Sequence, residues 1–204
     1  ETLTWGYSFN IDSPDIWHEE VGAVIRAKLL SDGGHYSPRN ARYDWLTINH
    51  FADMSGGGVG VTLSNADAYY MQLGNSTHTA LDATTPQLNI LAGGQVDGPN
   101  LGIPNQGGDA KFLQRFALQT HGAFNQTSAM KFSLEHQNPL VTHQVTGTDP
   151  SYNEKNYSFL TISDPDVLLW ALKPAEDGIS QGVIARVWNQ ANAARNYTLS
   201  LAPS

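Results

Sequence analysis

The residues best suited to chemistry gather between Asp32 and His50, where aromatic and hydrogen-bonding side chains outnumber aliphatic ones. Aromatic rings stack on the C–H faces of sugars, while guanidinium and carboxylate groups bind neighbouring hydroxyls in pairs. We therefore expect Arg39, Arg42, Tyr43 and Asp44 to form a polar edge that contacts a sugar. The alternative is a loop anchored by buried aromatic residues, with its arginine and aspartate side chains paired internally.

The other titratable residues form no recognisable catalytic motif. The histidines show neither the i,i+4 spacing of a helical zinc site nor an H-x-H pair, so we expect no metal in this chain. Glu135 and His136 could serve a small sugar epimerase or hydrolase as acid and base, but adjacent residues on a strand face opposite ways. We interpret Glu19 and Glu20 as helix-start residues that favour the helix dipole.

The composition restricts the class of protein. A chain of 204 residues, 40% hydrophobic and 15% charged, predicts a single globular domain over residues 1–204. Eleven Lys and Arg against nineteen Asp and Glu give a net charge of −8, which disfavours nucleic acid as a partner. The absence of cysteine excludes a disulfide framework and a thiolate nucleophile. No apolar run approaches the roughly 18 residues that cross a bilayer, so no membrane partner is expected.

Alternation of apolar and polar residues predicts an all-β protein. The stretch Thr2 to Ile11 alternates almost without interruption and is expected to be a half-buried strand. Turn residues separate nine or ten such strands, which favours a large antiparallel β-sandwich. Further strands are expected at 46–52, 59–63, 67–73, 111–119, 129–136, 167–172, 183–188 and 197–201.

Three segments carry more specific expectations. Ser13-Pro-Asp resembles a helix start, so we expect a helical turn at about 14–19 that leads into a strand at about 21–30. The apolar run Val167–Leu172, which includes Trp170, predicts a central strand buried on both faces. The glycine-rich residues 92–110 predict a long loop, whose role the sequence does not define.

Four segments, in order, share a pattern with one known family. Phe51-Ala-Asp-Met-Ser55 and Gly60-Val-Thr-Leu-Ser-Asn65 follow an Arg/Asn-rich stretch from Arg39. They resemble an aromatic-x-Asp-Leu-Ser turn and a Gly-Val-Ala-Leu-Leu-Asn strand. Phe116-Ala-Leu-Gln-Thr-His-Gly122 is similar to aromatic-Ala-Leu-x-Pro-His-Gly, and Asn138-Pro-Leu140 to Asn-x-Pro. These patterns occur in the C-terminal domains of glycoside hydrolase family 38, the α-mannosidases.

The fourth segment carries the most specific resemblance. Val167-Leu-Leu-Trp-Ala-Leu-Lys-Pro-Ala-Glu-Asp-Gly178 and Gly182-Val-Ile-Ala-Arg-Val-Trp-Asn189 resemble the family's strand, Ala-Leu-Lys, acidic-Gly turn and Ile-Arg-aromatic strand. The four segments together span about residues 39–201. Residues 1–30 match poorly, and the 94–109 loop has no counterpart.

The resemblance implies a role inside a larger enzyme. Family 38 members are retaining, zinc-dependent α-mannosidases whose aspartate nucleophile and zinc ligands lie in an N-terminal catalytic domain and its neighbour. This chain would lie downstream of both, as a sandwich like the large supersandwich of galactose mutarotase-like proteins. It would pack on the missing catalytic domain and lend residues to the edge of a mannoside pocket, with the zinc held in that catalytic domain.

A free-standing carbohydrate-binding module is the alternative function. The loops rich in aromatic residues, Asn and Asp and the low charge density support this second function. Four Asn-x-Ser/Thr sequons, at Asn75, Asn125, Asn156 and Asn196, are slightly more than chance would give and favour a glycosylated protein.

Overall fold

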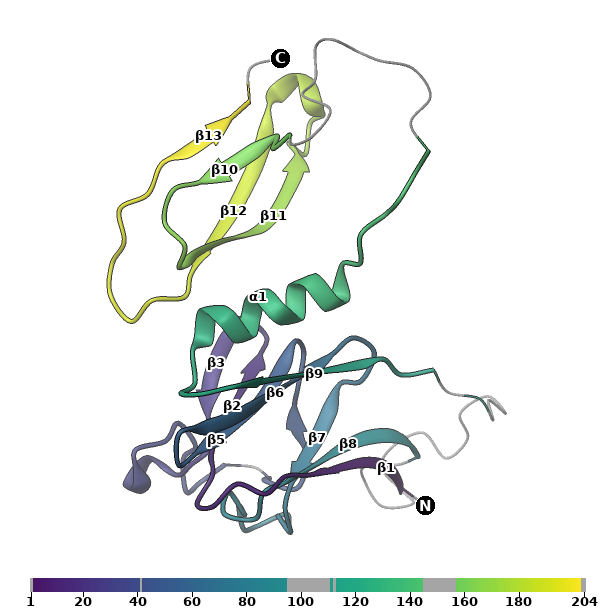
Figure 1. The fold of residues 1–204 in the computed structure, drawn as a ribbon, viewed down its shortest axis with the longest axis vertical. Coiled ribbons are helices and arrows are strands. Elements are labelled where there is room, and N and C mark those ends of the chain that lie inside the picture. The colour runs from purple at the N-terminus through teal and green to yellow at the C-terminus, as the bar shows by residue number, and fades with distance from the viewer. Residues whose placement is uncertain (1, 41, 95–110, 112, 145–156, 203–204) are drawn as a thin grey trace. The chain divides into compact units, whose positions relative to one another are not determined.

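The computed structural model describes residues 2–40, 42–94, 111, 113–144 and 157–202. The chain forms two compact units, Glu1–Pro139 and Leu140–Ser204, where the sequence alone predicts one domain. The protein is all-β with antiparallel sheets, as its alternation predicts (Figure 1).

The first unit is a sandwich of two antiparallel sheets. The five-stranded sheet has the order β3-β2-β5-β6-β9, and the four-stranded sheet has the order β1-β8-β7-β4. The described elements are β1 (Thr2–Ser8), β2 (Asp15–Glu20), β3 (Ala23–Arg26), a 3-10 turn (Leu30–Asp32), β4 (Leu46–Thr47), β5 (Phe51–Gly56), β6 (Val59–Asn65), β7 (Tyr70–Leu73), β8 (Gln87–Gly94), β9 (Phe116–His121) and α1 (Gln126–Gln137).

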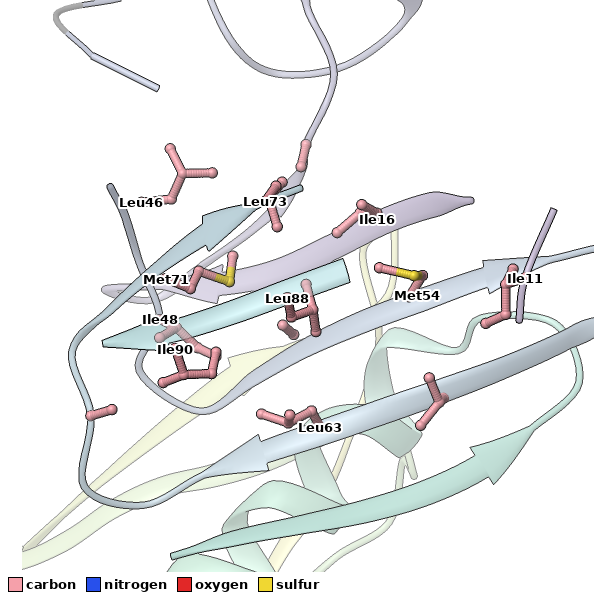
Figure 2. Packing of buried hydrophobic residues seen from close by; sticks show 14 residues of the cluster. Ile11, Ile16, Leu46, Ile48, Met54, Leu63, Met71, Leu73, Leu88 and Ile90 are labelled. Carbon is pink, nitrogen blue, oxygen red and sulfur yellow. The ribbon is translucent and has the colours of Figure 1, made fainter. Parts of the chain in front are cut away.

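The apolar core lies between these two sheets. Successive side chains of a strand point to opposite faces of its sheet. In β5, Ala52 and Met54 point into the core, while Asp53 and Ser55 point to the opposite face. Figure 2 shows the side chains that meet there, all buried: Ile11, Ile16, Leu46, Ile48, Met54, Leu63, Met71, Leu73, Leu88 and Ile90. Burying this cluster fixes the register of each strand, because a slip of one residue would turn its apolar set outward.

Helix α1 covers the other face of the five-stranded sheet, where the sequence pattern predicts a strand at 129–136. That expectation is wrong because Asn125 caps a helix: its side chain accepts the Ser128 N–H at 2.8 Å. The buried residues Thr127, Met130 and Ser133 then recur every three residues and face the sheet.

The helical turn expected at 14–19 is also wrong, because this segment is strand β2. It pairs with both β3 and β5, so it lies inside the sheet. Ser13 and Val21 adopt positive φ angles of 49° and 47°, which turn the chain at each end of the strand. Glu19 is therefore a buried strand residue and does not cap a helix.

Strand β1 is confirmed as a strand but not as half-buried. It pairs only with β8 and forms an edge of its sheet among the described residues, which leaves Leu3 57% exposed. Of the loop expected at 92–110, residues 92–94 belong instead to β8, which continues to Gly94; residues 95–110 lie outside the described part of the chain.

The connection between β7 and β8 is organised by Asp82. Its carboxylate accepts N–H bonds from Asn75, Thr84 and Thr85, at 2.9–3.0 Å. The hydroxyls of the two threonines donate to it as well. Burial opposes ionisation, but these donors outweigh it and lower the pKa of Asp82 well below its usual range.

The second unit contains two antiparallel pairs, β10 (Leu160–Ile162) with β13 (Leu199–Leu201) and β11 (Val167–Pro174) with β12 (Val183–Asn189). A 3-10 turn (Ile179–Gln181) lies between β11 and β12.

The central, doubly buried strand expected at 167–172 is wrong. Val167 and Leu168 are buried, but Trp170 is 38% exposed. The physical reason is local: β11 pairs with β12 alone in the described sheets, and a register shift between Leu169 and Ala171 changes the direction of Trp170. Its ring packs edge-on against Trp188 at 5.0 Å.

His18 should make the stability of the first unit depend on pH. It is fully buried on the core side of β2, with Nε2 2.9 Å from the Tyr36 hydroxyl, and burial lowers its pKa from 6.5 to about 4. The unfolded chain therefore binds the proton first. The free energy of unfolding should fall as the pH drops from 6.5 to 4, by up to about 1.4 kcal/mol per pH unit.

The variant His18→Gln should remove this slope, and urea denaturation across the same pH window measures it. His78→Gln, at an exposed histidine, is the matched control and should keep the wild-type slope. An unchanged slope in His18→Gln would show that another group titrates there.

Candidate functional site

Aromatic residues anchor the 35–45 loop to the sandwich. The Tyr36 hydroxyl lies 2.9 Å from His18 Nε2, and the His35 Nδ1 accepts the Arg26 N–H at 2.9 Å. Tyr43 is only 4% exposed, and its hydroxyl donates to the Ser37 carbonyl at 2.6 Å. Tyr43 thus acts as an internal anchor, and its ring offers no free face for a sugar.

Arg42 and Asp44 form a two-pronged ion pair on the same loop. Arg42 donates from Nε to Oδ1 at 2.8 Å and from Nη2 to Oδ2 at 3.0 Å. The bond from Arg42 holds the pKa of Asp44 below its usual value. Arg39 is exposed. Of the four residues expected to contact a sugar, Arg42 and Asp44 are therefore paired with each other and Tyr43 is buried. Arg39 alone of the four lies exposed at the surface.

A second aromatic cluster, centred on Trp17, lies beside His35. The ring of Trp17 stacks on Phe124 at 5.1 Å, and His35 meets it edge-on at 5.9 Å. The guanidinium of Arg26 lies 5.6 Å from the centre of the Trp17 ring. Sequence reasoning missed this cluster because its members come from β2, β3, the 35–45 loop and the segment before α1.

The Asp15 carboxylate pairs with two basic side chains of this region. Both of its carboxylate oxygens accept from Arg26 Nε, at 2.9 and 3.1 Å, and Oδ1 also forms an ion pair with Lys28 Nζ at 2.9 Å. Burial opposes ionisation, but the bonds from Arg26, Lys28 and Trp17 outweigh it and lower the pKa of Asp15.

Lys28 also lines a cleft of about 450 Å³. Its other walls are Ser13, Pro14, Leu29, Asp32, Leu81, Ala83 and Thr84.

Two buried carboxylates on the face of the five-stranded sheet each bind a histidine. Glu19 Oε2 lies 2.6 Å from His50 Nδ1, and its Oε1 accepts the Gly22 N–H at 2.6 Å. Asp53 Oδ2 lies 2.6 Å from His121 Nε2. The histidines contribute donors that burial of a carboxylate requires.

Asp53 is the more heavily bonded of the two carboxylates. Its Oδ1 accepts from the Ser55 hydroxyl at 2.7 Å and its Oδ2 from the Thr62 hydroxyl at 2.5 Å. Burial nevertheless raises its pKa. Because both oxygens are engaged by neighbours, Asp53 is arranged as a structural group and not as a free nucleophile.

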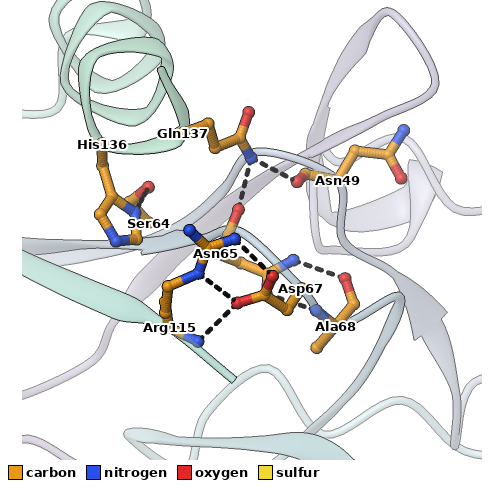
Figure 3. Close-up of polar contacts among 8 residues, drawn as sticks. All are labelled: Asn49, Ser64, Asn65, Asp67, Ala68, Arg115, His136 and Gln137. Carbon is orange, nitrogen blue, oxygen red and sulfur yellow. Dashed lines mark hydrogen bonds and ion pairs between the residues drawn. The ribbon is translucent and has the colours of Figure 1, made fainter. Parts of the chain in front are cut away.

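His136 serves to dock α1 on the sheet (Figure 3). Its Nδ1 lies 2.8 Å from the Ser64 hydroxyl, and the neighbouring Gln137 donates to the carbonyls of Asn49, at 3.0 Å, and Asn65. Glu135, by contrast, is exposed. The acid–base pairing of Glu135 with His136 therefore gains no support from their arrangement.

An ion pair beside this junction ties β9 to the end of β6. Arg115 donates from Nε and Nη2 to the two oxygens of Asp67, at 3.0 and 2.7 Å (Figure 3). The Asn65 side chain closes the intervening turn by accepting the Ala68 N–H and donating to its carbonyl. These bonds stabilise the turn and leave no unpaired charge there.

No cluster of three or more His, Asp or Glu side chains that could hold a metal ion occurs among the described residues. Within the same part of the chain, no helix is long and apolar enough to span a membrane.

Comparison with known proteins adds no family assignment. No protein-family model matches the sequence, and no curated protein matches it significantly.

Replacing Arg42 by alanine should raise the pKa of Asp44 toward its ordinary value, because the bond from Arg42 is the main cause of its depression. Carbon-detected NMR titration of the carboxyl group measures this change. The free energy of unfolding should fall by roughly 0.5–1 kcal/mol, as for other partly exposed pairs. Arg39→Ala is the control and should change neither quantity. An unshifted Asp44 in Arg42→Ala would contradict the pairing.

Proposed function

We propose that this chain is the C-terminal β-sandwich region of an α-mannosidase-like retaining glycoside hydrolase, with no catalytic activity of its own. The supporting observation is where the mannosidase-like segments fall in the fold. Gly60–Asn65 and Phe116–His121 fall in β6 and β9, and Phe51–Ser55, which was expected as a turn, falls in β5. The three segments therefore lie in neighbouring strands of one sheet. Segments far apart in sequence thus build one contiguous structural unit.

The fourth segment also has a coherent structural role, which supports the same proposal. It forms the β11–β12 hairpin, whose connection is closed by the Ala175 N–H bond to the Gly182 carbonyl at 3.0 Å. Gly178 and Gly182 have φ angles of 104° and 108°, which favour glycine. The acidic-Gly turn of the motif therefore has a conformational reason for its glycines.

The carboxylates described above fit a structural role better than a catalytic one. A retaining glycosidase needs two carboxyl groups about 5 Å apart across the scissile bond, one of them free to attack. Glu19 and Asp53 instead have both oxygens engaged by residues of this chain. On this proposal the nucleophile and the zinc belong to a separate catalytic domain, which is also the main partner of this chain.

Within that enzyme, the 35–45 loop would contribute to the rim of the mannoside site. Arg39 is the candidate for direct contact, because it is exposed and a guanidinium can bind two adjacent hydroxyls. The Arg42–Asp44 pair and Tyr43 would hold the loop in position.

The full-length protein should hydrolyse an aryl α-mannoside with retention of configuration and should lose activity on removal of zinc. Residues 1–204 alone should show no turnover, with or without added zinc. Turnover that survives repurification of the isolated chain would reject the proposal, and so would a full-length protein without zinc-dependent mannosidase activity.

In the full-length protein, Arg39→Ala should lower kcat/KM by roughly tenfold and leave the melting temperature unchanged, since it removes a charge-assisted contact worth about 1.4 kcal/mol. Lys111→Ala, another exposed cation, is the matched control and should leave kcat/KM unchanged. Equal kinetics for the two variants would remove Arg39 from the site.

A further inference from the structure

The four-stranded sheet of the first unit contains no Asp, Glu, Lys or Arg in any of its strands β1, β4, β7 and β8. In the five-stranded sheet, β2, β3 and β5 all carry charged residues. An extended surface without charge is unusual in a chain with a net charge of −8, and it limits the ligands that this sheet can attract.

The outer face of this sheet is defined by alternation. Met71, Leu73, Leu88 and Ile90 are fully buried in the core, so their neighbours in sequence point to the opposite side. That outer side carries three partly buried amides, bordered by an exposed tyrosine and small hydroxyl residues. Its members are Thr4, Gly6, Ser8, Thr47, Tyr70, Gln72, Gln87, Asn89 and Leu91, here called the amide face. Helix α1 packs on the other sheet (Figure 1).

Hydrogen bonds hold the three amides of the amide face in fixed orientations. Gln87 Nε2 donates to Asn89 Oδ1 at 3.0 Å, and Asn89 Nδ2 donates to the Gly74 carbonyl at 3.3 Å. Gln72 Nε2 donates to the Ser76 carbonyl at 2.8 Å. Each amide nitrogen keeps a second N–H, and the Oε1 atoms of Gln72 and Gln87 accept no bond from the described residues. Oriented donors and acceptors therefore face outward.

Gly6 opens the surface above these amides. It pairs with Asn89 in the register, and Asn89 pairs with Gln72, so the three residues form one row across three strands. A Cβ atom at Gly6 would lie 3.4 Å from Asn89 Oδ1 and 3.7 Å from Gln87 Nε2. Without that carbon, a ligand can reach both amides from the side of β1.

Tyr70 supplies an aromatic surface next to the row of amides. It lies two residues before Gln72 on the same face of β7, about 7 Å along the strand, and is 41% exposed. A sugar ring that packs on the tyrosine would place its hydroxyls over the amide groups.

We propose that the amide face binds a neutral oligosaccharide. Neutral sugars offer many hydroxyl donors and acceptors and no charge, which matches fixed amides on an uncharged sheet. The carboxylates closest along the chain, Asp44 and Asp67, are each paired with an arginine. Asp82, five residues before Gln87, is bonded to N–H and O–H groups of its own turn. This site lies on a different sheet from the five-stranded one that carries the mannosidase-like segments, and it goes beyond the proposed role in an α-mannosidase.

Isothermal titration calorimetry of the full chain with mannohexaose, cellohexaose and xylohexaose tests the proposal, with tri-galacturonic acid as the charged comparison. At least one neutral sugar should bind with a Kd of roughly 10 µM to 1 mM, and the acidic sugar should bind more weakly. Absence of binding by all three neutral sugars at about 10 mM, or preference for the acidic one, would overturn the proposal.

Two variants locate the site. Gly6→Val should cover Asn89 and weaken binding at least tenfold while keeping the melting temperature, because a β-branched residue suits a strand and its Cβ has room. Tyr70→Ala should weaken binding to a similar degree. Tyr197→Ala, at a tyrosine of the second unit that is 43% exposed, should bind as the wild type does.

The variants also separate this site from other surfaces. Gln119→Ala, at an exposed amide on β9 of the other sheet, should not change binding. Binding that is unchanged in Gly6→Val and Tyr70→Ala would place the sugar elsewhere and overturn the proposal. Self-association that Gly6→Val abolishes, without sugar binding, would identify the face as a protein interface and overturn it as well. Mannosidase activity of the full-length protein does not enter these outcomes, so this inference and the proposed function can fail independently.

Discussion

The first unit depends on burying both faces of its five-stranded sheet. One face joins the apolar core, while the other lies under α1 and carries Glu19 and Asp53. A buried carboxylate without donors would cost several kcal/mol. The histidines at 50 and 121, with the hydroxyls on β5 and β6, supply those donors. Four of the seven histidines are thereby explained as structural partners, His50 and His121 of carboxylates and His18 and His136 of hydroxyls.

The sequence predicts this fold where one physical factor dominates. Strand β6 alternates clearly between core and opposite face, and it was expected at 59–63, close to its observed bounds of Val59–Asn65. The single strand expected at 46–52 is wrong, because its two ends belong to β4 and β5, which pair in different sheets. The prediction fails where two patterns coexist. In α1, the apolar residues fit a strand and a helix alike, and the Asn125 cap decides between them. In β2, helix-start residues precede a segment that two neighbouring strands hold in the sheet. Pairing partners distant in sequence decided the outcome there, and a single sequence does not display them.

The candidate site was predictable in composition but not in geometry. The mixture of arginine, tyrosine and aspartate in the 35–45 loop is evident from the sequence, whereas the Arg42–Asp44 pairing and the burial of Tyr43 follow from the path of the backbone. The Trp17 cluster was missed for the same reason, because Phe124 lies more than a hundred positions away. For the amide face, the sequence shows that the segments 2–8, 70–73 and 87–94 contain no charged residue. The row of Gly6, Asn89 and Gln72 follows only from the register of β1, β8 and β7.

The distribution of charge between the two sheets has a physical consequence for binding. Ion pairs concentrate around β2, β3 and β5, where carboxylates are satisfied by neighbouring residues and the side chains are fixed. A ligand that competes for those groups must break existing bonds, at a cost close to what it would gain. On the amide face, only part of the hydrogen-bonding capacity of Gln72 and Gln87 is used within the chain. A neutral ligand can therefore add bonds there without breaking any, which makes the sheet with the fewest titratable groups the better binding surface of the two.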